Sequence, residues 1–244
     1  MWPFSSKKSL AELGAMDGMA DFHSHILPGV DDGMRNMATA LEALDCYADN
    51  GVTSVWLTPH IMEDYPNTPE LLRARFAELQ EAYNEGEDEG KIELHLAAEH
   101  MLDTLFTSRL EEGGLMPFDG NHLLVETSYF NPPTRLYELF EDIMHRGYRP
   151  ILAHPERYLY MSPDDYERLH SMGVVLQLNL PSVAGAYGPD PQARAEKLLK
   201  KGYYSIVGSD IHSLRATMSF MHRPIKESLA RRAVELIQQQ TLEH

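Results

Sequence analysis

The chain has 244 residues and a mass of 27.7 kDa, which is enough for one large α/β domain. Hydrophobic residues make up 43% and charged residues 24%, which are ordinary globular values and exclude a disordered or low-complexity chain. The formal net charge of −16 disfavours nucleic acid as a partner, because the field of the protein repels phosphate backbones.

Apolar runs and helical spacings alternate along the chain. The apolar runs predict seven short strands, at residues 20–23, 53–57, 92–97, 122–125, 149–153, 174–178 and 205–207. Helical spacing predicts helices between them, at residues 37–50, 68–85, 134–146, 162–171, 191–201 and 224–240. Strand, helix, glycine and strand in this order are typical of βαβ units on a parallel sheet. Seven such units fit a closed or nearly closed TIM-like (β/α)7 barrel better than an open sheet.

The two ends of the chain lack such a pattern. Residues 1–16 are expected to form an N-terminal arm, with Trp2 and Phe4 packing on a neighbour. Residues 17–241 are expected to form a single domain, and residues 242–244 resemble the remnant of a vector tag. The start of the chain lacks the apolar core of a secretory signal, and no apolar run approaches the roughly 20 residues that span a bilayer. We therefore expect a cytoplasmic protein that is not integral to a membrane.

Polar side chains stand at the carboxyl end of almost every predicted strand. Because these ends converge on one face of a parallel barrel, the side chains are expected to meet there. Burying imidazoles and carboxylates costs free energy unless they are paired or bound to metal, so the repetition indicates a shared compensating charge. The side chains in question are His23, His25, His60, Glu99, Glu126, His154, Asp210 and His212.

Two of these strand ends carry a pair of polar residues in alternation. His23 and His25 lie on the same side of an extended strand, so both imidazoles can reach one divalent ion. Asp210 and His212 repeat the arrangement with a carboxylate and an imidazole. Either pair alone is a weak signal, but together, with four further donors between them, they predict a metal site. Mixed imidazole and carboxylate ligands suit zinc, manganese or iron.

Three segments resemble motifs of a known superfamily. The sequence from Asp21 to Gly33, Asp-Phe-His-Ser-His-Ile-Leu-Pro-Gly-Val-Asp-Asp-Gly, closely resembles the opening motif of the polymerase-and-histidinol-phosphatase (PHP) superfamily. It is most similar to the branch of bacterial tyrosine phosphatases linked to capsular and exopolysaccharide synthesis. Residues 153–158, Ala-His-Pro-Glu-Arg-Tyr, and residues 208–212, Gly-Ser-Asp-Ile-His, resemble two further motifs of that branch.

This resemblance implies a distorted (β/α)7 barrel of the PHP fold with a trinuclear metal centre. It adds Asp32 to the strand-end donors and makes Arg157 the residue that binds the substrate phosphate. A second family arginine lies a few residues after the Asp-x-His motif. Arg215 is the candidate, although it is about two positions out of register. The implied metal ligands are His23, His25, Asp32, His60, Glu99, Glu126, His154, Asp210 and His212.

Nine ligands are too many for one metal ion and more than two ions need. Three divalent ions would carry +6 against four carboxylates, and the surplus would favour an anionic substrate inside an acidic protein. This matches metal-assisted phosphate ester hydrolysis. The resemblance implies a protein tyrosine phosphatase with three manganese, iron or zinc ions. Its partner would be a phosphotyrosine protein, such as the tail of a polysaccharide-assembly kinase.

Several alternatives stay open or are excluded by single residues. Histidinol phosphatase shares the metal site, so only the shape of the pocket would separate the two activities. A metal-binding regulatory protein without catalysis is a further alternative. Amidohydrolases usually bridge their metals with a modified lysine, and none of the seven lysines ends a predicted strand. A cysteine-dependent phosphatase needs an arginine six residues after its cysteine, but the only cysteine, Cys46, is followed there by Val52.

The remaining histidines and aromatic residues carry weaker predictions. His100 follows Glu99 and should point away from the site if the strand continues. Tyr129, Phe130 and Tyr158 follow strand ends. They are expected either to form an aromatic wall of a substrate cleft or to pack in the core or loops, and the sequence favours neither alternative. Surface or structural positions are expected for His95, His122, His145, His170 and His222.

Overall fold

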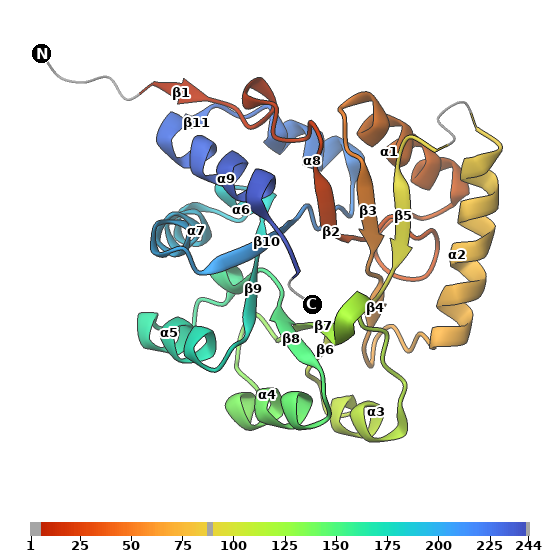
Figure 1. The fold of residues 1–244 in the computed structure, drawn as a ribbon, viewed down its shortest axis with the longest axis vertical. Helices are drawn as coiled ribbons and strands as arrows, with labels where there is room; N and C mark the ends of the chain where they lie inside the picture. The colour runs from red at the N-terminus through yellow and green to blue at the C-terminus, as the bar shows by residue number, and fades with distance from the viewer. Residues whose placement is uncertain (1–5, 87–89, 243–244) are drawn as a thin grey trace, which may run out of the picture.

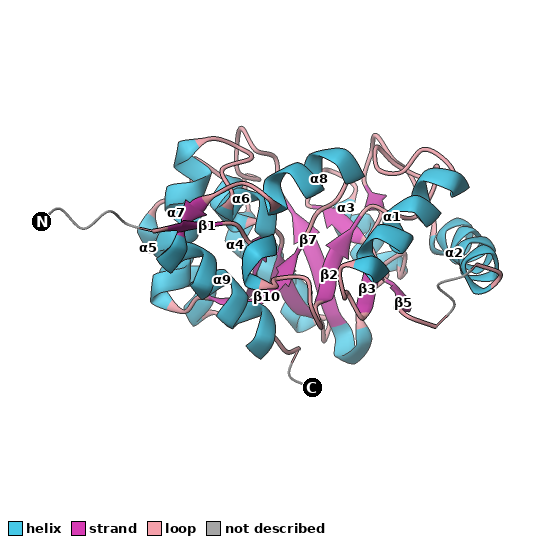
Figure 2. Ribbon diagram, turned by 90° about the horizontal axis from the view of Figure 1, so that it is seen from above, coloured by secondary structure: helices cyan, strands magenta, loops and turns pink. Residues whose placement is uncertain are grey.

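The computed structural model describes residues 6–86 and 90–242, and its centre is a set of short parallel strands (Figure 1). Helices connect most of these strands and lie outside them, so that helices surround the strands (Figure 2). The central strands are β2 (Ala20–Ser24), β3 (Ser54–Leu57), β4 (His60–Ile61), β5 (Glu93–Leu96), β6 (Glu99–Met101), β7 (His122–Glu126), β8 (Arg149–Leu152), β9 (Val175–Asn179) and β10 (Tyr204–Gly208). The helices are α1 (Met37–Asp49), α2 (Pro69–Asn84), α3 (Phe106–Glu112), α4 (Leu136–His145), α5 (Pro163–Ser171), α6 (Leu180–Val183), α7 (Pro189–Lys201), α8 (Leu214–Met221) and α9 (Glu227–Gln239).

The strands form two parallel sheets that join into one distorted barrel. The order is β2-β3-β5 in one sheet and β10-β9-β8-β7-β6-β4 in the other. Two residues separate β3 from β4 and β5 from β6, so each pair continues one strand from the first sheet into the second. Backbone hydrogen bonds from Asp210 N to His23 O (2.8 Å) and from His25 N to Ile211 O (3.2 Å) close the ring between β10 and β2. These features confirm the predicted α/β barrel with seven strand positions.

The helix starts follow from local sequence. Asn36 caps α1 in a reciprocal capping box with Thr39, and Ser162 caps α5 in the same way with Asp165. The hydroxyl of Thr68 accepts a hydrogen bond from Leu71 N at the start of α2, where proline occupies the first turn. These caps position the helices that the sequence pattern predicted.

Three short helices and one antiparallel strand pair were not predicted. They are α3, α6 and α8, together with β1 (Lys7–Lys8) and β11 (Ile225–Lys226). The short strands β4 and β6 lie beyond the ends of the predicted strands at 53–57 and 92–97. The predicted helix at 224–240 was wrong at its start, because residues 225–226 pair antiparallel with β1 before α9 begins at Glu227. Within the N-terminal segment Leu10 and Met16 are buried in the core. Trp2, Phe4 and the end of the expected tag remnant, Glu243 and His244, lie outside the described residues.

In the part of the chain that the structure describes, no helix combines the length and the apolar character needed to cross a membrane. The longest helices are amphipathic: α2 buries Leu72, Leu79 and Tyr83 and exposes its opposite side. The barrel interior is apolar below the strand ends and polar at their carboxyl ends, so the fold directs the predicted donors to one place.

Candidate metal centre

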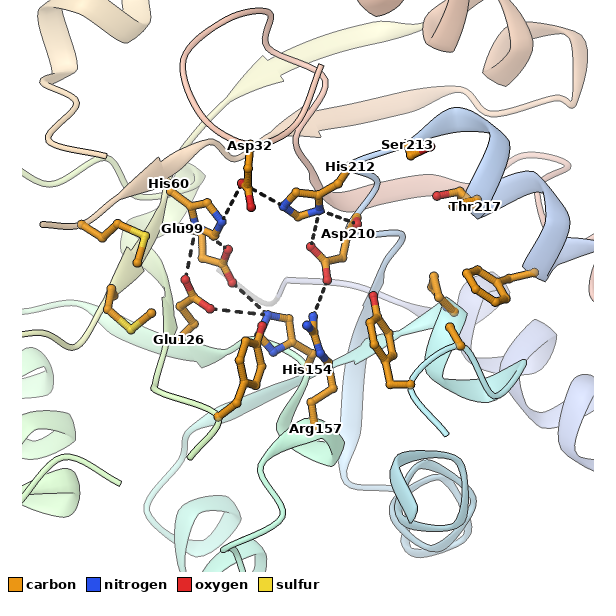
Figure 3. Close-up of a pocket in the computed structure, with 18 of the residues that line it drawn as sticks. Asp32, His60, Glu99, Glu126, His154, Arg157, Asp210, His212, Ser213 and Thr217 are labelled. Carbon is orange, nitrogen blue, oxygen red and sulfur yellow. Dashed lines mark hydrogen bonds and ion pairs between the residues drawn. The ribbon is translucent and has the colours of Figure 1, made fainter. Parts of the chain in front are cut away.

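All nine predicted donors meet at the carboxyl ends of the strands. Seven of them line one cavity of about 570 Å³ (Figure 3), and His23 and His25 are buried beneath it against the other donors. Their ligand atoms form four overlapping groups, and within each group these atoms lie within 4.8 Å of one another. The groups are His25, Asp32, His60 and His212; His23, His25 and Asp210; His23, Glu99 and His154; and His60, Glu99 and Glu126. Because His23, His25, His60 and Glu99 each belong to two groups, the arrangement suits neighbouring ions that share ligands.

The two imidazoles from β2 and its end are aimed inward by buried partners behind them. The Nδ1 atom of His23 lies 3.0 Å from Gln177 Oε1, and Nδ1 of His25 lies 2.8 Å from Asp31 Oδ2. Both Nε2 atoms therefore face Glu99 and Asp210, and they lie 3.1 Å apart. Such outer partners fix the tautomer and the ring orientation of a metal-binding histidine. Sequence reasoning had assigned no role to Gln177 or Asp31.

Two glycines make room for these partners. A Cβ atom on Gly208 would lie 2.0 Å from Gln177 Nε2 and 2.4 Å from His23 Cβ. A Cβ on Gly33 would lie 2.1 Å from the carbonyl oxygen of His25. Any larger residue would push the imidazoles out of place, so both glycines are required by close approach rather than by backbone freedom.

Glu99 lies at the centre of the donors. Its Oε2 atom is 3.3 Å from His23 Nε2 and 3.1 Å from His60 Nδ1, and its Oε1 atom is 3.1 Å from His154 Nε2. Glu126 approaches His60 Nδ1 to 3.2 Å from the other side. In the described part of the chain, Glu99 Oε2, His60 Nδ1 and His154 Nδ1 are buried and form no hydrogen bond of regular geometry, although the first two atoms lie 3.1 Å apart. Such orphaned polar atoms are costly to bury, so this donor set fits metal ions.

Asp210 connects the donors to the wall of the cavity. Its Oδ1 atom lies 3.4 Å from His212 Nδ1, and its Oδ2 atom accepts hydrogen bonds from Arg157 Nη1 (2.6 Å) and Asn179 Nδ2 (2.8 Å). His212 Nε2 lies 3.3 Å from Asp32 Oδ1. One carboxylate oxygen of Asp210 is thus held from outside while the other faces the imidazoles.

The charges of the donors depend on one another. Burial disfavours the charged form of His23, but Glu99 and Asp210 outweigh burial and raise its pKa to about 9. For His212, Asp32 and Asp210 likewise outweigh burial and raise the pKa to about 9. Burial also opposes ionisation of Glu99, but His23 and His154 hold its pKa well below the usual range. Raised pKa values favour protons on His23 and His212 without metal, so metal binding at these two imidazoles would release protons.

Arg157 stands beside the donors in a stack of two tyrosines. Its Cζ atom lies 4.4 Å from the ring centre of Tyr129 and 4.1 Å from that of Tyr187. Burial disfavours the cation, but Asp210 and the tyrosines outweigh burial and raise the pKa of Arg157 above its usual value. The guanidinium plane is therefore fixed next to the donors. Arg215 is exposed on α8, outside the lining of the cavity as far as the described residues define it.

The other predicted residues fall into place around the site. His100 points away from the cavity, as expected: its Nδ1 is 3.2 Å from Leu124 O and its Nε2 accepts from Met116 N. Tyr129 lines the cavity, whereas Tyr158 is fully buried behind it and Phe130 is exposed. His145, His170 and His222 are exposed, His95 is half-buried, and His122 is buried.

The barrel fold and the donor set define a metal-binding α/β barrel, and comparison with known proteins gives the family. The chain belongs to the family of capsular polysaccharide synthesis proteins CpsB/CapC, whose pattern matches residues 19–240. It is 28% identical over 203 residues to the tyrosine-protein phosphatase YwqE of Bacillus subtilis, covering 81% of this chain and 78% of that protein. It is 26% identical over 214 residues to the tyrosine-protein phosphatase CpsB of Streptococcus pneumoniae, covering 84% and 87%.

Solved structures agree with these relatives. Crystal structures of YwqE and CpsB, described as unique metal-dependent tyrosine phosphatases, match with a TM-score of 0.74 and 25% identity over 92% of this chain and 96% of that one. A lactonase from Listeria monocytogenes matches with a TM-score of 0.55 at 13% identity, which shows the fold alone. The predicted family is confirmed, and with it the expected barrel and the link to metal-dependent tyrosine phosphatases.

Proposed function

We propose that this chain is a metal-dependent protein tyrosine phosphatase that holds three divalent ions, of manganese, iron or zinc. The observation that carries the proposal is the meeting of nine predicted donors in one set of overlapping groups beside a fixed arginine. The phosphatase names of the relatives support it. The nine donors would hold the ions, with His23, His25, His60 and Glu99 in the shared positions.

Bound divalent ions would polarise the phosphate ester and lower the pKa of water at the site. The residues of the chain orient the metal ligands and bind the phosphate. Asp31 and Gln177 hold the imidazoles of His25 and His23 with Nε2 inward, and Asn179 holds Asp210. Arg157 is the one arginine or lysine among the described residues that line the cavity, so we assign phosphate binding to it and not to Arg215. A guanidinium fits two phosphate oxygens at once.

The outer wall of the cavity favours an aryl phosphate over histidinol phosphate. This wall is aromatic and apolar, with Tyr65, Tyr129, Tyr187 and Phe220 among its residues. Histidinol phosphate carries an ammonium group that needs a carboxylate partner. The described carboxylates that line the cavity are Asp32, Glu99, Glu126 and Asp210, and all four belong to the donor set.

The proposal extends to the setting of the enzyme. We propose a single catalytic domain over residues 17–241, a cytoplasmic location, and a phosphotyrosine protein as substrate. The proposed partner is the tail of a tyrosine kinase that takes part in polysaccharide assembly. The description of the family as capsular polysaccharide synthesis proteins supports this partner.

The test compares phosphotyrosine, p-nitrophenyl phosphate and histidinol phosphate as substrates of protein loaded with manganese or zinc. We expect hydrolysis of the two aryl phosphates at least tenfold more efficient than that of histidinol phosphate, which is about 1.4 kcal/mol of discrimination. Chelation should abolish activity, reloading should restore it, and elemental analysis should find more than one ion per chain. Activity that survives complete removal of metal would refute the proposal.

A further inference from the structure

Exposed apolar side chains gather on the loops that surround the cavity. Among the residues that the structure describes, the exposed large hydrophobic side chains are Leu71, Leu105, Phe130, Leu159 and Tyr187, and Phe130 is 86% exposed. All except Leu71 lie on loops that follow β6, β7, β8 and β9, respectively. These strands are consecutive neighbours in one sheet, so their loops are neighbours too. We call Leu105, Phe130, Leu159 and Tyr187 the apolar rim.

Contacts tie together the three loops that carry Phe130, Leu159 and Tyr187. The ring of Tyr129, next to Phe130, stacks on Tyr158, next to Leu159, with 5.8 Å between ring centres. The guanidinium of Arg157 lies between Tyr129 and Tyr187, which ties the loops after β7, β8 and β9 together. Scattered exposed apolar residues are normal, but four of them on neighbouring loops around one cavity indicate an interaction surface.

The rim is continuous with the cavity. Tyr129 and Tyr187 line the cavity with one part of their loops, while Phe130 extends into solvent immediately beyond. The four rim side chains are uncharged in a protein with a formal net charge of −16, which repels acidic polypeptides. The rim therefore offers apolar contact to a bound segment.

We infer that the apolar rim docks the polypeptide on either side of the phosphotyrosine, through large apolar side chains of that segment. The inference rests on the proposed function and names the substrate more closely. A phosphotyrosine held at Arg157 belongs to a chain that must leave the cavity across its mouth. An extended segment advances about 3.3 Å per residue, so side chains within a few positions of the phosphotyrosine reach the rim.

The test uses two phosphotyrosyl peptides of equal length and charge. One carries leucine and phenylalanine near the phosphotyrosine, and the other carries serine and glycine there. We expect wild-type protein to prefer the apolar peptide by about tenfold in kcat/KM. The double variant Phe130→Ser/Leu159→Ser should lose this preference and keep its activity on p-nitrophenyl phosphate, because neither residue lines the cavity.

Leu71→Ser is the matched control. Leu71 is 49% exposed, close to the 50% of Leu159, but it lies on α2, on the opposite side of the molecule from α5 (Figure 1). The Leu71→Ser variant should retain the preference for the apolar peptide. The inference fails if wild-type protein shows no preference, if the double variant keeps it, or if Leu71→Ser loses it equally. If no aryl phosphate is hydrolysed, the proposed function fails instead, and calorimetric binding of the same two peptides then decides whether the rim docks them.

Discussion

Replacement of Asp31 tests most directly whether buried partners behind the metal-binding histidines hold them in place. The Asp31 side chain is fully buried and accepts hydrogen bonds from His25 Nδ1 (2.8 Å), Gly33 N (2.9 Å) and His60 N (3.1 Å). In Asp31→Asn one oxygen becomes an NH₂ group, which faces donors instead of accepting from them. The variant keeps the size of the side chain and loses the charge together with at least one of these bonds.

The magnitude follows from the pKa of this carboxyl. Burial alone would raise the pKa, but His25 and the N–H of Gly33 outweigh burial and lower it from 3.8 to about 2. The folded pKa lies below the unfolded one, so the stabilisation is complete above about pH 4 and disappears as the pH falls towards 2. The difference is worth about 2 kcal/mol at pH 7 in the metal-free protein. Loss of an outer partner also weakens metal binding by roughly 10- to 100-fold.

Two measurements check these numbers. Urea unfolding of chelated protein at pH 7 should show Asp31→Asn less stable by about 2 kcal/mol, with the gap narrowing below pH 4. Competition with a chromophoric chelator should show weaker zinc or manganese binding. Asp32→Asn is the neighbouring control: its side chain is 51% exposed, so it should weaken metal binding as a lost ligand with little effect on metal-free stability. Equal metal affinity in wild-type and Asp31→Asn protein would refute the role given to Asp31.

The remaining predictions concern the arginine and the cysteine. Arg157→Ala should lower kcat/KM for phosphotyrosine by about 10²-fold, or about 3 kcal/mol, with metal content retained in elemental analysis. Loss of the metals in that variant would make Arg157 a structural partner of Asp210 instead. Cys46→Ser should keep full activity, and a thiol alkylator should not inhibit, because Cys46 is half-buried on α1 outside the cavity lining. Burial and nearby acids raise the pKa of its thiol, and inactivation by the substitution would contradict the metal-dependent mechanism.

The strand-end donors could be predicted because two simple regularities place them. Alternation puts His23 and His25 on one side of a strand, and parallel strands bring their carboxyl ends together. Neither regularity depends on a distant partner, so an isolated sequence contains the information. The same holds for the caps of α1 and α5, whose partners are three residues apart.

The outer partners could not be predicted in this way. Gln177 and His23 are 154 residues apart, and only the closure of the barrel brings them to 3.0 Å. Asp31 and Asp32 are adjacent and chemically identical, but one turns back to His25 and the other turns into the cavity. The helix α8 was missed because it spans only eight residues and no side chain caps its start, so it is too short to give an extended apolar repeat.

Backbone strain at two donors links the metal centre to the phosphate-binding arginine. Among the described residues other than glycine, positive φ occurs at Asn121, His154 (35°) and Asp210 (51°), so two of three belong to the donor set. Such backbone costs of order 1 kcal/mol per residue and persists where the surroundings enforce it. The bonds from Asp210 N to His23 O and from Arg157 N to His154 O supply that enforcement. The turn that aims His154 inward also starts the short 3₁₀ helix Pro155–Arg157, and this helix brings Arg157 to Asp210. A change of either residue to an ordinary backbone conformation would therefore move a metal donor and Arg157 together. The strained backbone at His154 and Asp210 thus keeps the donors and the arginine in a fixed arrangement.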